Sequence, residues 1–142
     1  MEMKLDMQDI QYLNLFSKIT RVRASNCFAY NSYVVFVVKP GTIMQAVGNE
    51  GANVKRISEE IGKRVKVVPA PSSDKDIKKF VLAIVHPVQF KNLTNNEGEV
   101  TIHAGGIQPR AMLIGRESSK LNELKLILKQ YFKVRSVRIA WF

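Results

Sequence analysis

The sequence contains one pattern twice, and this repeat limits the possible folds more than any other feature. Each copy has two stretches of helical spacing separated by a short break, Gly48 to Gly51 in the first and Gly115 to Ser118 in the second. The offset from Gly48 to Gly115 is 67 residues. At this offset the apolar helix positions correspond as Val54 with Leu121, Ile57 with Leu124 and Ile61 with Leu128. Solenoid repeats have periods of roughly 20 to 50 residues, so the longer offset predicts two small globular domains in tandem.

Hydrophobic periodicity and turn residues predict the element order α-β-β-α-α-β in both copies. In the first copy we expect helices over 6–20, 42–47 and 52–61, with Thr42 as a cap, and strands over 22–30, 33–38 and 65–68. In the second we expect helices over 77–85, 108–114 and 119–132, and strands over 88–93, 99–103 and 134–139. The predicted fold class is α+β.

One stretch, residues 69–74, is rich in Pro and Ser and poor in packing residues, which is typical of a linker. We therefore expect a first domain over 1–70, a linker over 71–76 and a second domain over 77–142.

Composition excludes several classes of protein. The chain has 46% hydrophobic and 24% charged residues, as ordinary globular proteins do. Its longest apolar runs, 33–38 and 80–85, have six residues each, far fewer than the roughly 20 that a spanning helix needs. The N-terminus lacks the apolar stretch of a secretory signal. We expect a cytoplasmic protein with no membrane partner.

Nothing in the sequence predicts an enzyme. Cys27 is the single cysteine, and one thiol with two histidines does not make a common zinc site. His86 and His103 come without the nucleophile and orienting acid of a triad. Glycine-rich nucleotide cradles after a strand are missing too. We therefore expect no catalytic residue, no metal and no cofactor. The aromatic residues near the C-terminus are expected to complete a core; they are Tyr131, Phe132, Trp141 and Phe142.

The charge indicates a polyanionic partner. The formal net charge is +10 and the pI is about 9.9. The excess is spread over both copies, with +4 in residues 1–70 and +6 in residues 71–142. Nucleic acid is the commonest polyanion inside cells, although a ribosomal, membrane-surface or acidic-protein partner would be compatible with the same sum.

The broken helix pair resembles the core of a KH domain. A Gly-x-x-Gly break allows tight backbone turns, so that the chain can press main-chain amides against a sugar-phosphate backbone. With a hairpin before the helix pair and a strand after it, each copy resembles the type II KH arrangement. That resemblance implies a three-stranded mixed sheet with helices on one face, and a groove for about four unpaired nucleotides.

Three segments, 10–16, 35–41 and 46–55, resemble the first KH domain of the short, archaeal-type NusA family, and the likeness of layout covers nearly the whole chain. The resemblance implies binding of single-stranded RNA, and action with RNA polymerase in transcription elongation, termination or antitermination.

The expected RNA-binding residues lie in and just after the two breaks. They are Gly48, Asn49, Glu50, Gly51, Asn53, Lys55 and Arg56 in the first copy, and Gly115, Arg116, Glu117, Ser118 and Lys120 in the second. Apolar residues beside the breaks are expected to form the groove floors: Met44, Val47, Val54, Met112 and Leu113.

Both breaks depart from the usual KH loop. The first has Asn49 and Glu50 where a cation is usual, and the second ends in Ser118 instead of glycine. We therefore expect each domain to bind weakly alone and the short tether to help. Two alternatives stay open: a KH protein of ribosome assembly or of the ribosome, and a protein-docking module with a degenerate KH scaffold.

Overall fold

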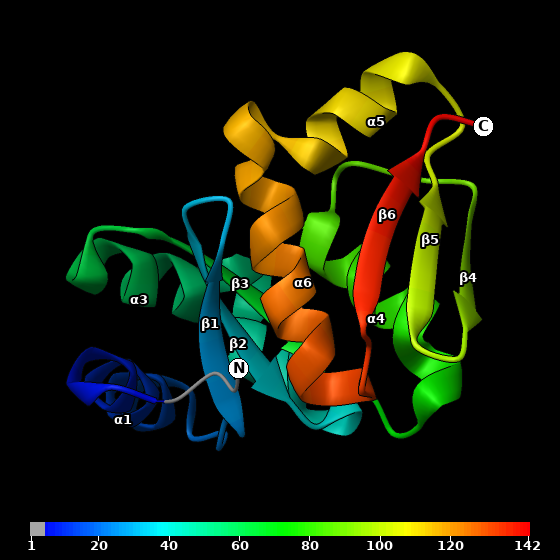
Figure 1. Cartoon of the computed structure of the whole chain (residues 1–142). Coiled ribbons are helices and arrows are strands. Elements are labelled where there is room, and N and C mark those ends of the chain that lie inside the picture. The colour runs from blue at the N-terminus through cyan, green and yellow to red at the C-terminus, as the bar shows by residue number, and fades with distance from the viewer. Residues whose placement is uncertain (1–4) are drawn as a thin grey trace. The chain divides into compact units, whose positions relative to one another are not determined.

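The computed structural model describes residues 5–142, and in this range the chain forms two compact units, the first ending at Ala70 and the second beginning at Pro71. Each unit contains three α-helices and one three-stranded sheet in the order α-β-β-α-α-β (Figure 1). In each sheet the first two strands pair antiparallel, and the third pairs parallel with the second. The sheets are therefore mixed and the fold class is α+β, as predicted.

The helices and strands of the first unit are α1 (Met7–Thr20), β1 (Asn26–Tyr30), β2 (Tyr33–Val38), α2 (Ile43–Val47), α3 (Ala52–Ile61) and β3 (Arg64–Pro69). A reciprocal capping box starts α1: the Asp9 N–H donates to the Asp6 carboxylate over 2.8 Å, and the Asp6 N–H donates to the Asp9 carboxylate over 3.1 Å. Gly62, in the left-handed conformation, ends α3. Thr42 was predicted as a side-chain cap of α2, and this is wrong, because its hydroxyl donates to the Lys39 carbonyl oxygen.

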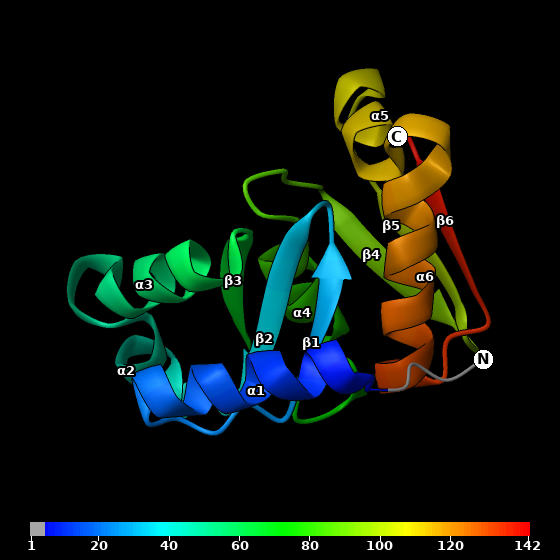
Figure 2. The ribbon, with the colours of Figure 1, turned by 90° about the vertical axis from the view of Figure 1, so that its left-hand side faces the viewer.

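The core of the first unit lies between its helices and one face of its sheet (Figure 2). The strand β2 is central in the order β1-β2-β3. Its alternate residues Val34, Phe36 and Val38 belong to the same buried cluster as residues of all three helices. Phe16 of α1 stacks on Phe36 with ring centroids 4.4 Å apart, and Ile57 of α3 is fully buried beside them. In this unit the three helices pack on one face of the sheet, as the sequence predicted.

The helices and strands of the second unit are α4 (Ile77–Val85), β4 (Asn92–Asn96), β5 (Glu99–His103), α5 (Ile107–Ile114), α6 (Ser119–Phe132) and β6 (Ser136–Ala140). A short 3-10 helix over Asp74–Asp76 leads into α4 within the stretch that the sequence predicted as a linker. Phe80 of α4 packs against Tyr131 and Phe132 at the end of α6, with ring centroids 4.9 and 5.8 Å apart. These two aromatic residues of α6 therefore do complete a core.

Three strands differ by two or more residues from the sequence expectation. The strand predicted over 88–93 is wrong: β4 runs from Asn92 to Asn96. The hairpin turn is the residue pair Glu97 and Gly98, both with positive φ, so that Asn96 pairs directly with Glu99. In the first unit, residues 22–25 connect α1 to β1 and lie outside the strand. The closing strand β6 begins two positions later than the predicted 134.

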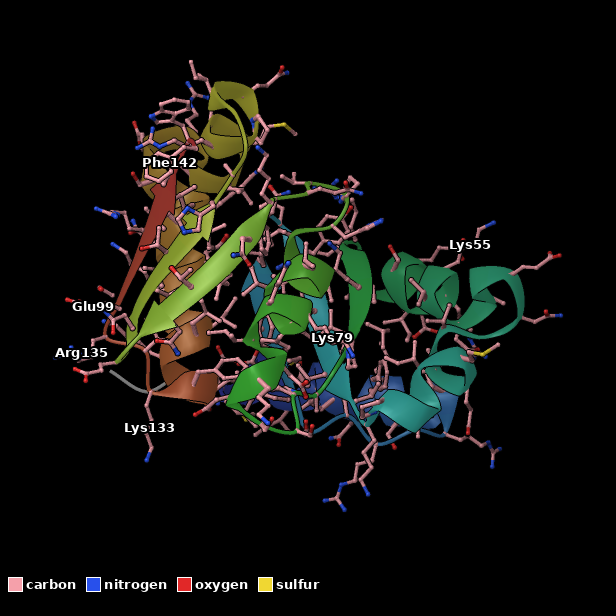
Figure 3. The ribbon with its side chains drawn as sticks, turned by 90° about the vertical axis from the view of Figure 1, so that its right-hand side faces the viewer. Lys55, Lys79, Glu99, Lys133, Arg135 and Phe142 are labelled. Atoms are coloured by element: carbon pink, nitrogen blue, oxygen red, sulfur yellow. The ribbon has the colours of Figure 1, made fainter. Side chains whose placement is uncertain are left out.

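The last two residues also differ from the expectation. Trp141 and Phe142 were predicted to finish a core, but 59% and 60% of their surfaces are exposed. The ring centroids of Trp141 and Phe142 are 5.8 Å apart, and those of Phe142 and His103 are 5.6 Å apart. Figure 3 labels Phe142. They lie beyond the end of β6, where no further strand residue pairs with β5.

Candidate functional site

The first candidate site is the break between α2 and α3. Gly48 has φ 83° and ψ 171°, a conformation that essentially only glycine adopts. Glu50 and Gly51 follow in the left-handed region, with φ 54° and ψ 31°, then φ 75° and ψ 17°. This succession reverses the chain between the two helices and leaves Asn49 and Glu50 exposed at the tip.

The second break, between α5 and α6, has nearly the same backbone. Gly115 has φ 77° and ψ 176°, Glu117 has φ 55° and ψ 33°, and Ser118 has φ 62° and ψ 22°. Ser118 therefore adopts the left-handed conformation that Gly51 adopts in the first unit, despite its Cβ. The two breaks are one structural motif, although only the first has the full Gly-x-x-Gly sequence.

Close packing explains the first glycine of each break. A Cβ on Gly48 would lie 2.9 Å from the backbone nitrogen of Asn53, and a Cβ on Gly115 would lie 2.7 Å from Cγ of Lys120. In the first unit the Asn53 side-chain amide also donates to the Gln45 carbonyl oxygen at 3.2 Å, which connects α3 to α2 across the break. Asn53 and Lys120 therefore pack against the breaks, at equivalent positions.

The breaks use some of their own amides. The N–H of Gly51 donates to the Gly48 carbonyl oxygen at 3.1 Å, and the N–H of Ser118 donates to the Gly115 carbonyl oxygen at 3.3 Å. The N–H of Gly48 and that of Gly115 donate back into the preceding helices. The two middle residues of each break are exposed, Asn49 and Glu50 in the first and Arg116 and Glu117 in the second.

The charges around the two breaks are unequal. Lys55 projects from α3 away from the ribbon (Figure 3), whereas the Arg56 guanidinium pairs with Glu60 at 3.8 Å, one turn farther from the break. Such an exposed i,i+4 pair contributes only about 0.3–0.5 kcal/mol, so it restrains Arg56 weakly. In the second break Arg116 is exposed at the tip.

The expected groove-floor residues fall into three groups. Met44 and Met112 are exposed, 86% and 47% of their surfaces respectively. Val47 and Val54 are half-buried, and Val54 packs against the core. Leu113 is fully buried, so its side chain is a core residue and not a groove floor. The prediction for Leu113 is wrong because helical spacing alone did not show which side of the short helix α5 faces the sheet.

The structure also shows an aromatic and basic cluster that the sequence reasoning missed. The Arg64 guanidinium lies 4.3 Å from the ring centroid of Tyr33, and the Lys66 ammonium lies 4.7 Å from it. Burial, and then the neighbouring Arg64, lower the pKa of Lys66. The cluster forms because the parallel register of β2 and β3 pairs Tyr33 with Arg64. The sequence alone does not give this register, so it could not predict the cluster.

The described residues offer no obvious reaction centre. Cys27 is buried, and burial, followed by the nearby Asp9 and Asp6 charges, raises the pKa of its thiol to about 12. Among residues 5–142 no group of three His, Cys, Asp or Glu side chains is placed to hold a metal ion. None of the helices in that range combines the length and the apolar character needed to cross a membrane.

Comparison with known proteins places the chain among archaeal relatives. No protein-family model matches it. The probable transcription termination protein NusA of Methanocaldococcus jannaschii is 28% identical over 141 residues, covering 97% of this chain and 75% of the relative. The protein of the same name from Halococcus morrhuae is 22% identical over 142 residues, covering 97% of this chain and 100% of the relative. The crystal structure of APE1850 matches 95% of this chain and 99% of its own, with a TM-score of 0.68 and 25% identity.

Two α-β-β-α-α-β units with matching breaks between their last two helices are consistent with tandem KH-like domains. Six matching proteins of archaeal origin, which align with most of this short chain, carry the name NusA. The chain is an archaeal-type NusA-like protein, as the sequence resemblance indicated.

Proposed function

We propose that the chain binds single-stranded RNA at its two breaks and acts with RNA polymerase in transcription elongation, termination or antitermination. The observation that carries the proposal is the shared backbone of the breaks, which persists at Ser118 although the sequence motif does not. The names of the archaeal relatives, probable transcription termination proteins, support the process. We also propose the type II KH arrangement, because a hairpin precedes the helix pair in both units.

Each break supplies amides for a phosphate. The N–H groups of Gly51 and Ser118 are engaged within the breaks, so we assign phosphate binding to the outer amides, those of Asn49 and Glu50 and those of Arg116 and Glu117. Main-chain donors of this kind hold the sugar-phosphate backbone without reading its sequence. Gly48 and Gly115 keep the helices close enough for these amides to converge.

Side chains beside the breaks complete the proposed sites. Lys55 in the first unit, and Arg116 and Lys120 in the second, would neutralise phosphate charge, with a smaller contribution from Arg56 because of its pair with Glu60. The exposed Met44 and Met112 offer apolar surface to bases. Neutralising about four phosphates of a single strand corresponds to a slope of log affinity against log salt of about −3.

Because of the acidic residues in the breaks, we expect each site to bind RNA weakly and tight binding to require both sites. Glu50 and Glu117 are exposed within the two breaks, where a carboxylate repels a nearby phosphate. A short connection between the units makes the second contact intramolecular, which raises the overall affinity without a new contact. We propose binding without catalysis, because the one thiol is buried and protonated at physiological pH.

A matched pair of substitutions tests the proposal. Arg116→Gln removes one positive charge at a break, and Lys129→Gln removes one from an exposed position in the last turn of α6. Binding of labelled single-stranded RNA is measured by fluorescence anisotropy at low salt. We expect Arg116→Gln to weaken binding about tenfold, since a contact to a charged group contributes roughly 1.5 kcal/mol or more, and Lys129→Gln to change it less than about twofold.

The opposite outcome favours a different function. Equal effects of the two substitutions would mean that RNA responds to net charge alone, and absence of binding by the unaltered chain would favour a protein-docking module. Copurification from an archaeal cell extract separates the remaining alternatives: RNA polymerase subunits support the proposal, and ribosomal subunits support a role in ribosome assembly or in the ribosome.

A further inference from the structure

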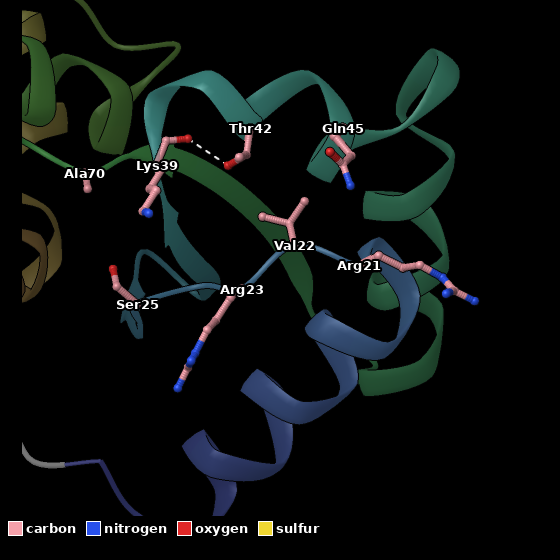
Figure 4. A pocket seen from close by; sticks show the side chains of 8 residues that line it. All are labelled: Arg21, Val22, Arg23, Ser25, Lys39, Thr42, Gln45 and Ala70. Carbon is pink, nitrogen blue, oxygen red and sulfur yellow. Dashed lines mark hydrogen bonds between the residues drawn. The ribbon is translucent and has the colours of Figure 1, made fainter.

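A second basic feature of the first unit lies apart from its break. A pocket of about 450 Å³ opens between the segment that follows α1 and the segment that leads from β2 into α2 (Figure 4). Its cations are Arg21, Arg23 and Lys39, and Ser25, Thr42 and Gln45 add polar groups. A volume in this range is typical of sites for small ligands. The residues around the opening supply three positive charges and no carboxylate.

The segment that carries the two arginines is held in place. Thr20, which is buried, donates its hydroxyl hydrogen to the Phe16 carbonyl oxygen at 2.8 Å and accepts the Val22 N–H at 3.0 Å. Val22 is therefore anchored in the core. Arg21 and Arg23 on either side of it are exposed, and their side chains extend in different directions from the segment, so they must turn toward the opening to meet one ligand (Figure 4). The backbone positions of the two arginines are thus fixed before any ligand arrives.

The opposite wall is ordered as well. The Thr42 hydroxyl donates to the Lys39 carbonyl oxygen at 2.7 Å, which fixes the turn between β2 and α2. The Ser25 N–H donates to the Val37 carbonyl oxygen at 2.8 Å, and the Ala70 N–H donates to the Val38 carbonyl oxygen at 2.7 Å. The hydroxyl oxygen of Thr42 keeps lone pairs that can accept a hydrogen bond from a ligand.

The second unit contains the same pocket without the charges. Equivalent hydrogen bonds, from Ser25 to Val37 and from Lys91 to His103, set an offset of 66 residues for this part of the repeat. At that offset the segment 21–23 corresponds to 87–89, and these three residues line a pocket of about 380 Å³ together with Gln108, Pro109 and Met112. Proline and glutamine there replace the two arginines, so the cations are not required to build the pocket.

We propose that the pocket of the first unit is a binding site for a nucleotide phosphate, separate from the break at Gly48–Gly51. Guanidinium groups match the geometry of phosphate oxygens, and two of them with a lysine suit a group of one to two negative charges. The pocket and the break lie at opposite ends of α2, about 7.5 Å of helix apart. The phosphate comes either from an RNA strand that also occupies the break or from a free nucleotide.

The test uses the whole chain and follows individual backbone amides by NMR. Uridine monophosphate, and separately a short single-stranded RNA, is added to the unaltered protein. The amide signals of Val22, Thr42 and Gln45 report the pocket, and those of Asn49 and Glu50 report the break. We expect the pocket signals to shift with one or both ligands: a shift with RNA alone identifies a strand phosphate, and a shift with the mononucleotide identifies a free nucleotide.

A charge-matched pair of variants makes the result specific. Arg21→Gln with Arg23→Gln removes two charges at the pocket, and Lys129→Gln with Lys133→Gln removes two from the end of α6, where Lys133 extends into solvent (Figure 3). We expect the pocket variant to bind the ligand about tenfold more weakly, and to lower the salt slope by about one if the ligand is RNA. The α6 variant should keep the pocket shifts.

Two outcomes would overturn the inference: pocket signals that stay unmoved by both ligands, or equal losses in the two double variants. The break signals are read in the same spectra, so the two hypotheses fail separately. Shifts at Asn49 and Glu50 without shifts at Val22 leave the proposed function standing and remove the pocket site. Shifts confined to the pocket support the pocket site and contradict the proposed binding at the break.

Discussion

The glycine that begins each break provides the sharpest test of the structure. Gly48→Ala places a methyl group where φ is 83° and ψ is 171°, and 2.9 Å from the backbone nitrogen of Asn53. A non-glycine residue in this region is strained by about 2 kcal/mol. The contact adds about 2 kcal/mol more, because a backbone atom cannot rotate away as a side chain can. We expect Gly48→Ala to lower the free energy of unfolding of the first unit by about 4 kcal/mol.

Two other glycines of the same unit serve as controls. Gly51 has a left-handed conformation, but a Cβ there would meet nothing within 4 Å, so Gly51→Ala should lower the free energy of unfolding by about 1 kcal/mol. Gly41 has open space around it and no positive φ, so Gly41→Ala should change the free energy of unfolding by less than about 0.5 kcal/mol. The predicted order separates the effect of contact from that of backbone conformation.

The assay is a urea titration followed by NMR on amide signals of β2, with Trp141 fluorescence as a reference for the second unit. With an m value of about 2 kcal/mol/M, the midpoint of the first unit should fall by about 2 M for Gly48→Ala. If its midpoint falls no further than that of Gly51→Ala, the close approach of α2 and α3 at the break does not define the loop, and the steric reasoning fails.

Two more predictions concern the core of the first unit. Burial raises the pKa of the Cys27 thiol to about 12 from 9.0, so a thiol reagent at pH 8 should leave the folded chain unmodified and react after unfolding. Because the folded pKa is the higher one, the contribution of this thiol to the free energy of unfolding should be constant below pH 9 and decrease as the pH rises from 9 toward 12. Phe16→Ala removes a fully buried ring stacked on Phe36 and should lower the free energy of unfolding by about 3–5 kcal/mol, measured by urea denaturation. Met44→Ala, at an exposed position, should change it by less than about 0.5 kcal/mol, and a similar loss for both would refute the core assignment.

Local chemistry explains which elements could be predicted from the sequence. The helices 52–61 and 119–132 have the predicted bounds because each follows a break and has an apolar stripe. The first strand of the hairpin in the second unit was misplaced because Val88 and Phe90 resemble strand residues, whereas the actual strand Asn92–Asn96 contains three asparagines. Pairing with β5 and the turn at Glu97 and Gly98 outweigh that weak local preference.

The candidate sites divide in the same way. The breaks were located from glycine and spacing, but their backbone angles, and the packing of Lys120 on Gly115, required coordinates. Ser118 shows why: tertiary packing imposes a left-handed conformation that a serine does not favour by itself. The pocket at Arg21, Arg23 and Lys39 was not predictable at all, because its wall comes from segments that only the strand pairing brings together.

The two units place their cations at different ends of the corresponding short helices, α2 in the first unit and α5 in the second. In the first unit the break contains Asn49 and Glu50 without a cation, and the arginines lie in the pocket at the beginning of α2. In the second unit Arg116 lies in the break itself, and the equivalent pocket has no charge. A polyanion bound by both units would therefore meet its strongest positive charge at the pocket in one and at the break in the other. The substitution Gln89→Arg places a cation in the pocket of the second unit. It should add an anion site there without altering the backbone of either break.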